Sequence, residues 1–586
     1  MPSKDSPFVV APWIEVWSLR RWMTDPHTVA TFDKNHLNLG ILLRNFLDSL
    51  QLKAARPDIR LGYMVSINVY DLFSKDEAGN WHFDEGFMDF FGELFRAVGR
   101  PVVINLRANH FVGEGPLAAE LMAHEDTFAQ LNDGTAVREI YYLNTVFAPT
   151  FSVDPAIPFN GYRFGGFAKA ASKLAEFDRQ HPGIIHAVTL AGELHHFLPE
   201  LANPRVSGLF EGVQMTDYSP ASVRDFRQWL KNKYGGLRQI NERFGTPFQA
   251  WEEVEPPRWD LRHGRDEAAW MHCDSYANGI VPIFGWAASP LNGVLRVYLN
   301  GTDIGQAEYG LSRLDVYEAI PWLQDSDIGF RFDLEYQDLV PGGHVIHVVL
   351  QHDDGRRSLV GRRFLVVDGR ESDAPVGSMM AGLDDLPECI DERDRFAWID
   401  HPPICLPLRY NPYAVEWQEF REHQINALLL KFAEIAVEAG LAPDKLYSHQ
   451  IMPQFEGTWN RVAFGVPSKF PVSELFSPGV DLYGGAAVYR GLVKFLDGAR
   501  YGVPEMHPRM GRLVSRDVFR RALEYHRDSG ASFVCPYFMA LREPEGKVNT
   551  ATDPSNMVDA LLIHPLNPQF GSLFYYTALI EFLNQQ

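Results

Sequence analysis

Residues 186–193 read HAVTLAGE, and residues 501–505 read YGVPE. In each stretch a short, mostly apolar run is followed directly by a glutamate, Glu193 in the first and Glu505 in the second. Short apolar runs of this kind are typical of buried strands. If the two runs are parallel strands of one barrel, their carboxyl ends meet at the same face, and both carboxylates are expected there.

The alternation of strands and helices extends over most of the chain. Four strand candidates precede residue 200 and four follow residue 440: Phe8–Trp13, Leu61–Val69, Val102–Leu106, His186–Leu190, Leu446–Gln450, Val480–Tyr483, Gly502–Glu505 and Phe533–Tyr537. Helical spacing of apolar residues between them predicts crossover helices, for example at 87–98 and 417–440. This pattern predicts an α/β fold, a (β/α)8 TIM barrel. Two doubly wound domains are the alternative, but no Gly-rich phosphate loop follows any strand candidate.

The middle of the chain has a different character. Residues 281–370 contain alternating apolar runs such as VLRVYLNG and HVIHVVLQHDDG, separated by turn signals such as Asn300-Gly301. They predict an inserted all-β sandwich. The predicted domains are therefore 1–280, with barrel strands one to four, the sandwich at 281–370, and 371–586, with a linker at 371–404 followed by strands five to eight.

The amino-acid composition disfavours some classes of binding partner. The formal net charge is −21, which argues against nucleic acid or an anionic membrane as the main partner. The chain has 13 Trp and 22 Tyr residues, which suits stacking on sugar rings. The four cysteines are far apart, without metal-binding spacing, and neither a secretory leader nor a long apolar span is recognisable. We expect a cytoplasmic protein with no metal and no cofactor.

Two carboxylates at one barrel face suit the cleavage of a glycosidic bond. One carboxylic acid protonates the leaving oxygen, while the other carboxylate attacks the anomeric carbon or activates water. We therefore predict a glycoside hydrolase acting on an oligosaccharide or glycan, with Glu193 and Glu505 as the catalytic pair. His507 and Arg509 are predicted to keep Glu505 ionised. Asp71 and Asp481 are alternative acids.

Several segments resemble known families. Glutamates after strands four and seven resemble those of the clan A glycoside hydrolases. Residues 221–259, which include FRQWLKNKYGGLRQINERFGTPFQAWEEVEPPRW, resemble glycoside hydrolase family 42, the β-galactosidase family. The segments at 447–450 and 481–489 also resemble this family. The resemblance implies a retaining β-glycosidase with Glu193 as acid/base and Glu505 as nucleophile. Residues 281–370 resemble an immunoglobulin-like module common in bacterial carbohydrate-active proteins.

The sequence also departs from these families. Clan A enzymes usually carry Asn before the acid/base, where this chain has Gly192, and the zinc-binding cysteine cluster of family 42 is absent. The strings AGEL at 191–194 and EM at 505–506 instead resemble the β-amylases, which are inverting barrels. Two alternatives therefore stay open. One is an inverting hydrolase with Glu505 as general base, and the other is a noncatalytic glycan-binding or assembly protein.

Further side chains are expected to contact the carbohydrate substrate because they follow barrel strands or are aromatic. They are Trp13, Arg107, Asn109, His195, His449, Gln450, Trp459, Tyr483, Tyr489 and Tyr537. The pair His195-His196 lacks a third ligand at suitable spacing, so no metal site is predicted there. The sandwich shows no obvious aromatic platform in its sequence. An architectural or interface role is therefore expected for it, including an interface between copies in a homo-oligomer.

Overall fold

The structure is a computed structural model. It describes residues 7–14, 32–51, 56–109, 111–112, 117–124, 128–141, 144–196, 215–259, 268–273, 276–288, 293–311, 313–323, 327–367, 392–393, 396–452, 462, 465, 473–484, 492, 495–496, 498–508, 516–540 and 561–584.

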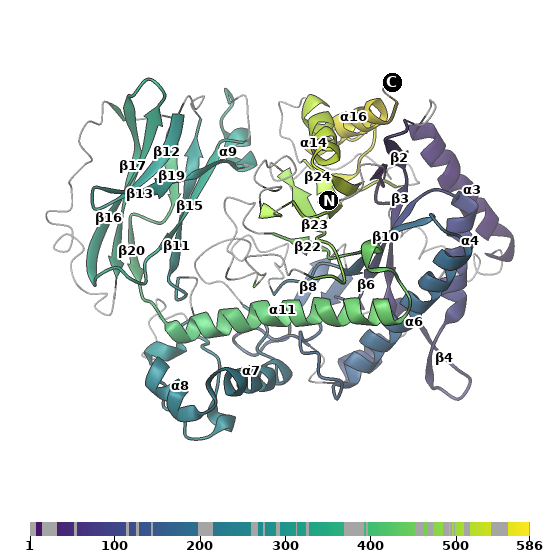
Figure 1. Ribbon diagram of the computed structural model, residues 1–586, viewed down its shortest axis with the longest axis horizontal. Helices are drawn as coiled ribbons and strands as arrows, with labels where there is room; N and C mark the ends of the chain where they lie inside the picture. Colours follow the sequence, from purple (N-terminus) through teal and green to yellow (C-terminus); the bar gives the residue numbers. More distant parts are fainter. Residues whose placement is uncertain are drawn as a thin grey trace.

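Eight parallel strand positions close into a barrel, on the right of Figure 1. They are β1 (Phe8–Val10), β3 (Tyr63–Asn68), β6 (Val102–Arg107), β10 (Ile185–Ala191), the short pair β21 (Leu446–Tyr447) and β22 (Gln450–Ile451), β23 (Val480–Tyr483), β24 (Tyr501–His507) and β25 (Ala531–Pro536). Each pairs in parallel with the next along the chain. The ring closes because β1 pairs with β25 on one side and with β2 (Ile59–Leu61), just before β3, on the other. All eight predicted strands are present.

Helices surround this barrel. They are α3 (Phe32–Leu50), α4 (Glu85–Val98), α6 (Pro158–Gln180), α11 (Pro412–Glu438), α14 (Arg516–Asp528) and α16 (Ser572–Asn584). Helix α4 shows why they form. The Asp84 side chain caps its first turn, and Gly99, with φ 66°, ends it in a left-handed conformation. Its buried face, including Phe91 and Phe95, packs inward, and burying each such ring contributes about 1.5–3 kcal/mol.

The barrel interior is filled with side chains. Met64, Val103, Ala187, Tyr447 and Phe533 come from five strands and form one buried cluster. A filled interior is the rule for eight-stranded barrels, in which the strands supply layers of inward side chains. The cluster supports the strand ends from below, so the side chains that follow these strands have fixed positions.

Two antiparallel sheets form a second body, on the left of Figure 1. One contains β11 (Ile280–Ala287), β14 (Glu308–Leu311), β15 (Gly329–Glu335) and β19 (Ala397–His401). The other contains β12 (Gly293–Leu299), β13 (Thr302–Gln306), β16 (Gly342–His352), β17 (Arg357–Val367), β18 (Glu392–Arg393) and β20 (Cys405–Leu408). They enclose a separate apolar core, which agrees with a sandwich. The likeness to an immunoglobulin-like module stays a prediction.

The structure differs from the prediction at the end of this body. Residues 371–404 were predicted as a linker, yet β18 and β19 fall within them and β20 follows directly. Strand β19 pairs with β11, and Ala397 and Ile399 point into the sandwich core while Trp398 is exposed. This two-residue alternation buries apolar surface, so the segment is held as strand.

Helix α11 connects the two bodies, as the long horizontal helix of Figure 1 shows. Its first turns pack beside α7 (Pro220–Tyr234) and α8 (Leu237–Phe244), where Tyr413 and Trp417 join Phe226 and Phe244 in an aromatic cluster. Its later turns pack on α6 and β10 of the barrel. The aromatic cluster therefore ties the segment after strand four to the helix that leads into strand five.

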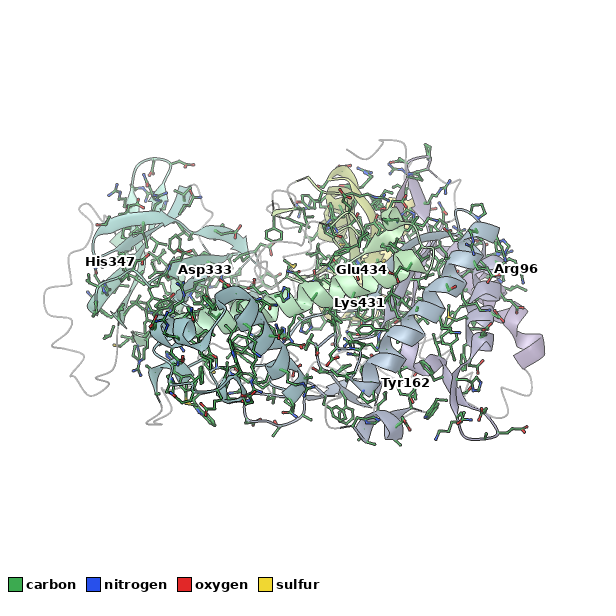
Figure 2. All side chains as sticks on the ribbon, turned by 60° about the horizontal axis from the view of Figure 1, so that its bottom comes forward. Arg96, Tyr162, Asp333, His347, Lys431 and Glu434 are labelled. Carbon is green, nitrogen blue, oxygen red and sulfur yellow. The ribbon has the colours of Figure 1, made fainter. Side chains whose placement is uncertain are left out.

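Side chains fill both bodies (Figure 2). The labelled ones lie in the sandwich, on the barrel helices and on α11: Asp333, His347, Arg96, Tyr162, Lys431 and Glu434. In the described part of the chain, every helix is too short or too polar to serve as a membrane span.

We predict that Gly479→Ala destabilises the barrel. Gly479 lies just before β23, and a Cβ atom built on it would lie 1.8 Å from the carbonyl oxygen of Ser448. Relieving this overlap must move backbone, so we expect a loss of about 1–3 kcal/mol in the free energy of unfolding. Urea denaturation measures it. The control is Gly165→Ala on α6, where nothing lies within 4 Å and a gain of about 0.5–1 kcal/mol is expected. Equal stability of the two variants would contradict this packing.

Candidate active site

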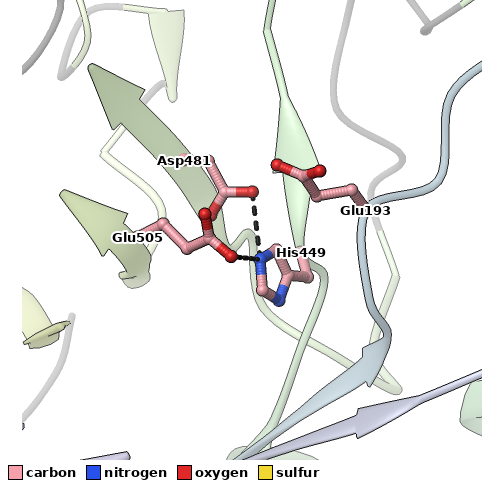
Figure 3. Close-up of side chains that lie close together, drawn as sticks. All are labelled: Glu193, His449, Asp481 and Glu505. Atoms are coloured by element: carbon pink, nitrogen blue, oxygen red, sulfur yellow. Dashed lines mark ion pairs between the residues drawn. The ribbon is translucent and has the colours of Figure 1, made fainter. Parts of the chain in front are cut away.

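Four side chains converge at the carboxyl ends of neighbouring barrel strands (Figure 3). They are Glu193 after β10, His449 between β21 and β22, Asp481 in β23 and Glu505 in β24. One nitrogen or carboxylate oxygen from each lies within 4.8 Å of those of the other three. The two predicted glutamates are therefore together at the face where active sites of such barrels lie.

The backbone bends sharply before Glu193. Ala191 and Gly192 have φ values of 63° and 83°, a conformation that is unfavourable for residues with a side chain. The bend is held by Asn109, whose Nδ2 donates to the backbone oxygen of Glu193 at 2.8 Å. A Cβ atom on Gly192 would lie 2.7 Å from Asn109 Oδ1. This close approach explains why glycine stands where clan A enzymes usually have asparagine.

His449 is the centre of the cluster. Its Nε2 lies 3.0 Å from Asp481 Oδ2 and 3.3 Å from Glu505 Oε1. On the other side of the ring, Nδ1 lies 3.2 Å from the hydroxyl oxygen of Thr189. Thr189 in turn donates its proton to Asn105 Oδ1 at 3.1 Å. The ring is 1 % exposed, so these contacts fix both its position and its orientation.

Glu505 has a second partner. The hydroxyl of Tyr483 donates a hydrogen bond to Glu505 Oε2. Burial and the charge of Glu505 raise the pKa of Tyr483 well above its usual value, so the phenol keeps its proton and acts as a donor. Glu505 therefore has the His449 ring near one carboxylate oxygen and the Tyr483 hydroxyl at the other.

The environment separates the protonation states of the acids. Burial, followed by the charges of Glu505 and Asp481, raises the pKa of Glu193 well above its usual value. Burial also raises the pKa of Asp481, to about 6, although His449 opposes the rise. For His449, burial acts against the charged ring, but Asp481 and Glu505 outweigh it and raise the pKa to about 10. At neutral pH His449 therefore carries a positive charge, and the raised pKa of Glu193 favours its protonated form.

The same four side chains are of types that bind metal ions, and they form the one such group among the described residues. Metal ligands must give up their protons. The raised pKa values of His449 and Glu193 favour the protonated forms of both groups, so a metal ion that bound here would have to displace these protons. The same protonated forms suit acid and base chemistry at these atoms.

The predicted substrate contacts lie in several environments. Trp13 is 9 % exposed and packs edge-on against the rings of His449 and Tyr537. Arg107 is half-buried at the end of β6, and Asn109 holds the Glu193 bend. His195 and Gln450 are buried. Trp459 and Tyr489 lie outside the described residues, as does Arg509.

One expectation from the sequence changes. The Nε2 of His507 lies 3.2 Å from Ser572 Oγ and its ring packs against Tyr575 on α16, so its effect on Glu505 stays a prediction. Asp481 is in the cluster but as the ion-pair partner of His449, a role that the sequence analysis missed. His449 and Asp481 lie at the ends of strands five and six, which are neighbours in the barrel. Their places in the sequence could therefore have predicted this contact.

One family matches the chain. Residues 187–269 match the family described as beta-galactosidase, glycoside hydrolase family 42. The matched segment contains most of β10, then Glu193, α7 and α8. No curated protein matches the chain.

Solved structures of glycoside-active enzymes are similar at low identity. The catalytic domain of the β-amylase from Paenibacillus polymyxa is 10% identical over 99% of each chain, with a TM-score of 0.46. The β-galactosidase from Bacillus circulans sp. alkalophilus is 11% identical with a TM-score of 0.40, over 95% of this chain and 56% of that one. The β-galactosidase from the psychrophilic Marinomonas ef1 is 16% identical with a TM-score of 0.25, over 43% of this chain and 30% of that one.

The family match supports a class of enzyme. The chain is a glycoside hydrolase, an enzyme that cleaves O-glycosyl bonds. The segment that carries the match is the part of the chain that resembles the β-galactosidases, and it includes one of the two glutamates.

We predict that Glu193 carries a proton at neutral pH because burial and the neighbouring carboxylates disfavour its charge. The infrared difference spectrum between the native protein and Glu193→Gln tests this. A carboxylic acid band should be present in the native protein and absent from the variant. The control is Glu242→Gln on the exposed face of α8, which should remove carboxylate bands instead. Loss of carboxylate bands in Glu193→Gln would contradict the assignment.

Proposed function

We propose that the protein hydrolyses a β-glycosidic bond in an oligosaccharide or glycan with retention of the anomeric configuration. Glu193 is the acid/base and Glu505 is the nucleophile. The observation that carries this proposal is that one carboxylate oxygen of Glu193 and one of Glu505 lie within 4.8 Å of each other. Retaining enzymes hold the two carboxyl groups about 5–5.5 Å apart, so that one of them can reach the anomeric carbon directly.

The reaction then has two displacements. In the first, Glu193 transfers its proton to the leaving oxygen while a Glu505 oxygen bonds to the anomeric carbon, and the bond to the leaving group breaks. In the second, the ionised Glu193 takes a proton from water as that water attacks the anomeric carbon. The bond to Glu505 breaks, and both carboxyl groups return to their starting states.

The protonation states support these roles. An acid must hold its proton at working pH, and the raised pKa of Glu193 supplies that condition. A nucleophile must be ionised, and Glu505 has the His449 ring and the Tyr483 hydroxyl at its two oxygens. Two carboxyl groups in one cluster thereby have opposite environments, as their opposite roles require.

We further propose that Asn109 contacts a sugar hydroxyl. Its Nδ2 is used by the Glu193 backbone, but its Oδ1 is buried without a hydrogen-bond partner among the described residues. A buried amide oxygen of this kind costs about 1–3 kcal/mol unless something donates to it. Asn109 lies against Gly192, so it stands close to the place that clan A enzymes usually fill with asparagine.

The inverting alternative needs more space. Inverting enzymes separate the carboxyl groups by about 6.5–9.5 Å, which leaves room for a water molecule between the sugar and the base. One oxygen of Glu193 and one of Glu505 lie within 4.8 Å of each other, a contact that suits direct attack. The noncatalytic alternative predicts glycan binding without turnover, and substitution of the two glutamates tests it.

We predict that Glu193→Gln lowers turnover about 10²–10⁴-fold, since it removes the proton donor. Glycosides with a good leaving group should lose less in the first step, because they need less protonation. Glu505→Gln should abolish turnover of both kinds of substrate because the nucleophile is lost. A glycan panel that begins with β-galactosides, given the family match, provides the assay. Glu242→Gln on α8 is the matched control and should retain full activity. Unchanged turnover in either active-site variant would refute the assignment of that residue.

Removal of metal ions should leave turnover unchanged, because the proposed steps use only protons and carboxylates. The measurement compares activity before and after dialysis against EDTA, with a further sample to which zinc or manganese is restored. A loss of activity on dialysis that is reversed by one added metal would show that the four-residue cluster works as a metal site instead.

A further inference from the structure

We infer that His449 is held as an imidazolium shared between Asp481 and Glu505, and that this cation keeps the nucleophile ionised. The residue is then a positioning residue that acts through Glu505, although the sequence analysis expected it to bind sugar. The consequence for catalysis rests on the proposed function of Glu505. The charge state of the ring does not, and it can be measured without any substrate.

The contacts of the Thr189 hydroxyl indicate that His449 Nδ1 carries a proton. The hydroxyl of Thr189 has one proton, and it donates that proton to Asn105 Oδ1. Asn105 Oδ1 can only accept. The Thr189 oxygen is therefore the acceptor in its contact of 3.2 Å with His449, and Nδ1 must be the donor.

The opposite nitrogen carries a proton as well. Nε2 lies at ion-pair distance from two carboxylate oxygens, 3.0 Å from Asp481 Oδ2 and 3.3 Å from Glu505 Oε1, without hydrogen-bond geometry to either. An ionised carboxylate offers only acceptors. A bare nitrogen lone pair between two carboxylates would meet repulsion from both. With protons on both nitrogens the ring is a cation, and it offsets part of the negative charge that the barrel buries at this point.

The groups around the ring reinforce this state. Among the described residues, the titratable side chains that face the cluster are Glu193 from the end of β10, Asp481 and Tyr483 from β23, Glu505 from β24, and Cys535 from β25. All of these are neutral or negative. Burial, followed by the charges of Asp481 and Glu505, raises the pKa of Cys535 well above its usual value, so it remains a thiol. Trp13 covers the ring edge, and the imidazole is 1 % exposed.

A cation in this place has a specific effect on the pH dependence of catalysis. It favours the ionised form of every carboxyl group near it. If it is removed, Glu505 takes up a proton more readily and Glu193 gives up its proton less readily. Both limbs of the bell-shaped profile of kcat/KM then move toward alkaline pH. A residue with only a packing role would lower the height of the profile and leave its limbs in place.

The charge state is measured by ¹⁵N NMR of the full-length protein with labelled histidine. The His449 signals are assigned by their loss in His449→Gln. We expect both ring nitrogens to carry protons at about pH 8, well above the ordinary histidine pKa of about 6.5. A neutral ring at that pH overturns the inference, whether or not the protein turns over a glycan.

The catalytic consequence is measured by pH profiles of three variants. His449→Gln should lower kcat/KM at neutral pH about 10²-fold, with both limbs moved toward alkaline pH. Thr189→Val removes the acceptor for Nδ1 without removing the ring, so it should move the limbs in the same direction by less. Thr189→Ser restores the hydroxyl and should return the native profile. Thr189→Val serves as the test if His449→Gln does not fold.

The matched control is His186→Gln. His186 is another histidine of β10 but lies at the opposite end of the strand, where its Nε2 is 3.1 Å from Ser532 Oγ. This variant should keep the native profile. A fall in height with fixed limbs in His449→Gln and Thr189→Val overturns the inference. Failure of the proposed function looks different, because the native protein would then show no turnover while the NMR signals still report the imidazolium.

Discussion

Three carboxyl groups and one imidazole share a buried site, and the cost of burying charge is the constraint on which the site depends. Isolated carboxylates lose several kcal/mol on burial and take up protons instead. Here Glu193 does so, while the cation on His449 stabilises Asp481 and Glu505 as anions. The charges of these four groups therefore determine which carboxyl group acts as the acid and which acts as the nucleophile.

The barrel brings these four side chains together. Parallel strands place the residues that follow them at one face, and the filled interior fixes their height. The strained bend at Ala191 and Gly192, held by Asn109, turns Glu193 toward the cluster. The aromatic cluster around Trp417 ties α7 and α8 to α11, and the inserted sandwich leaves the order of the barrel strands uninterrupted. An insertion of this size is therefore compatible with an intact set of strand ends.

The sequence was informative where one local pattern determined the outcome. Short apolar runs located the eight strands, and Glu193 and Glu505 stood out because each follows such a run. The sequence was uninformative where contacts join distant segments. His507 is near Glu505 in sequence and its ring packs against α16, whereas His449, which lies 3.3 Å from Glu505, comes from a strand more than fifty residues earlier. Strand β19 was missed because its partner, β11, lies more than a hundred residues earlier.

The central claim is that Glu505 attacks the sugar directly. The most direct measurement incubates the full-length protein with a 2-deoxy-2-fluoro glycoside that carries a good leaving group, followed by peptide mass spectrometry. The account predicts a covalent glycosyl group on Glu505, formed in the native protein and absent from Glu505→Gln. Turnover of the parent glycoside with inverted product and no label on Glu505 would contradict it.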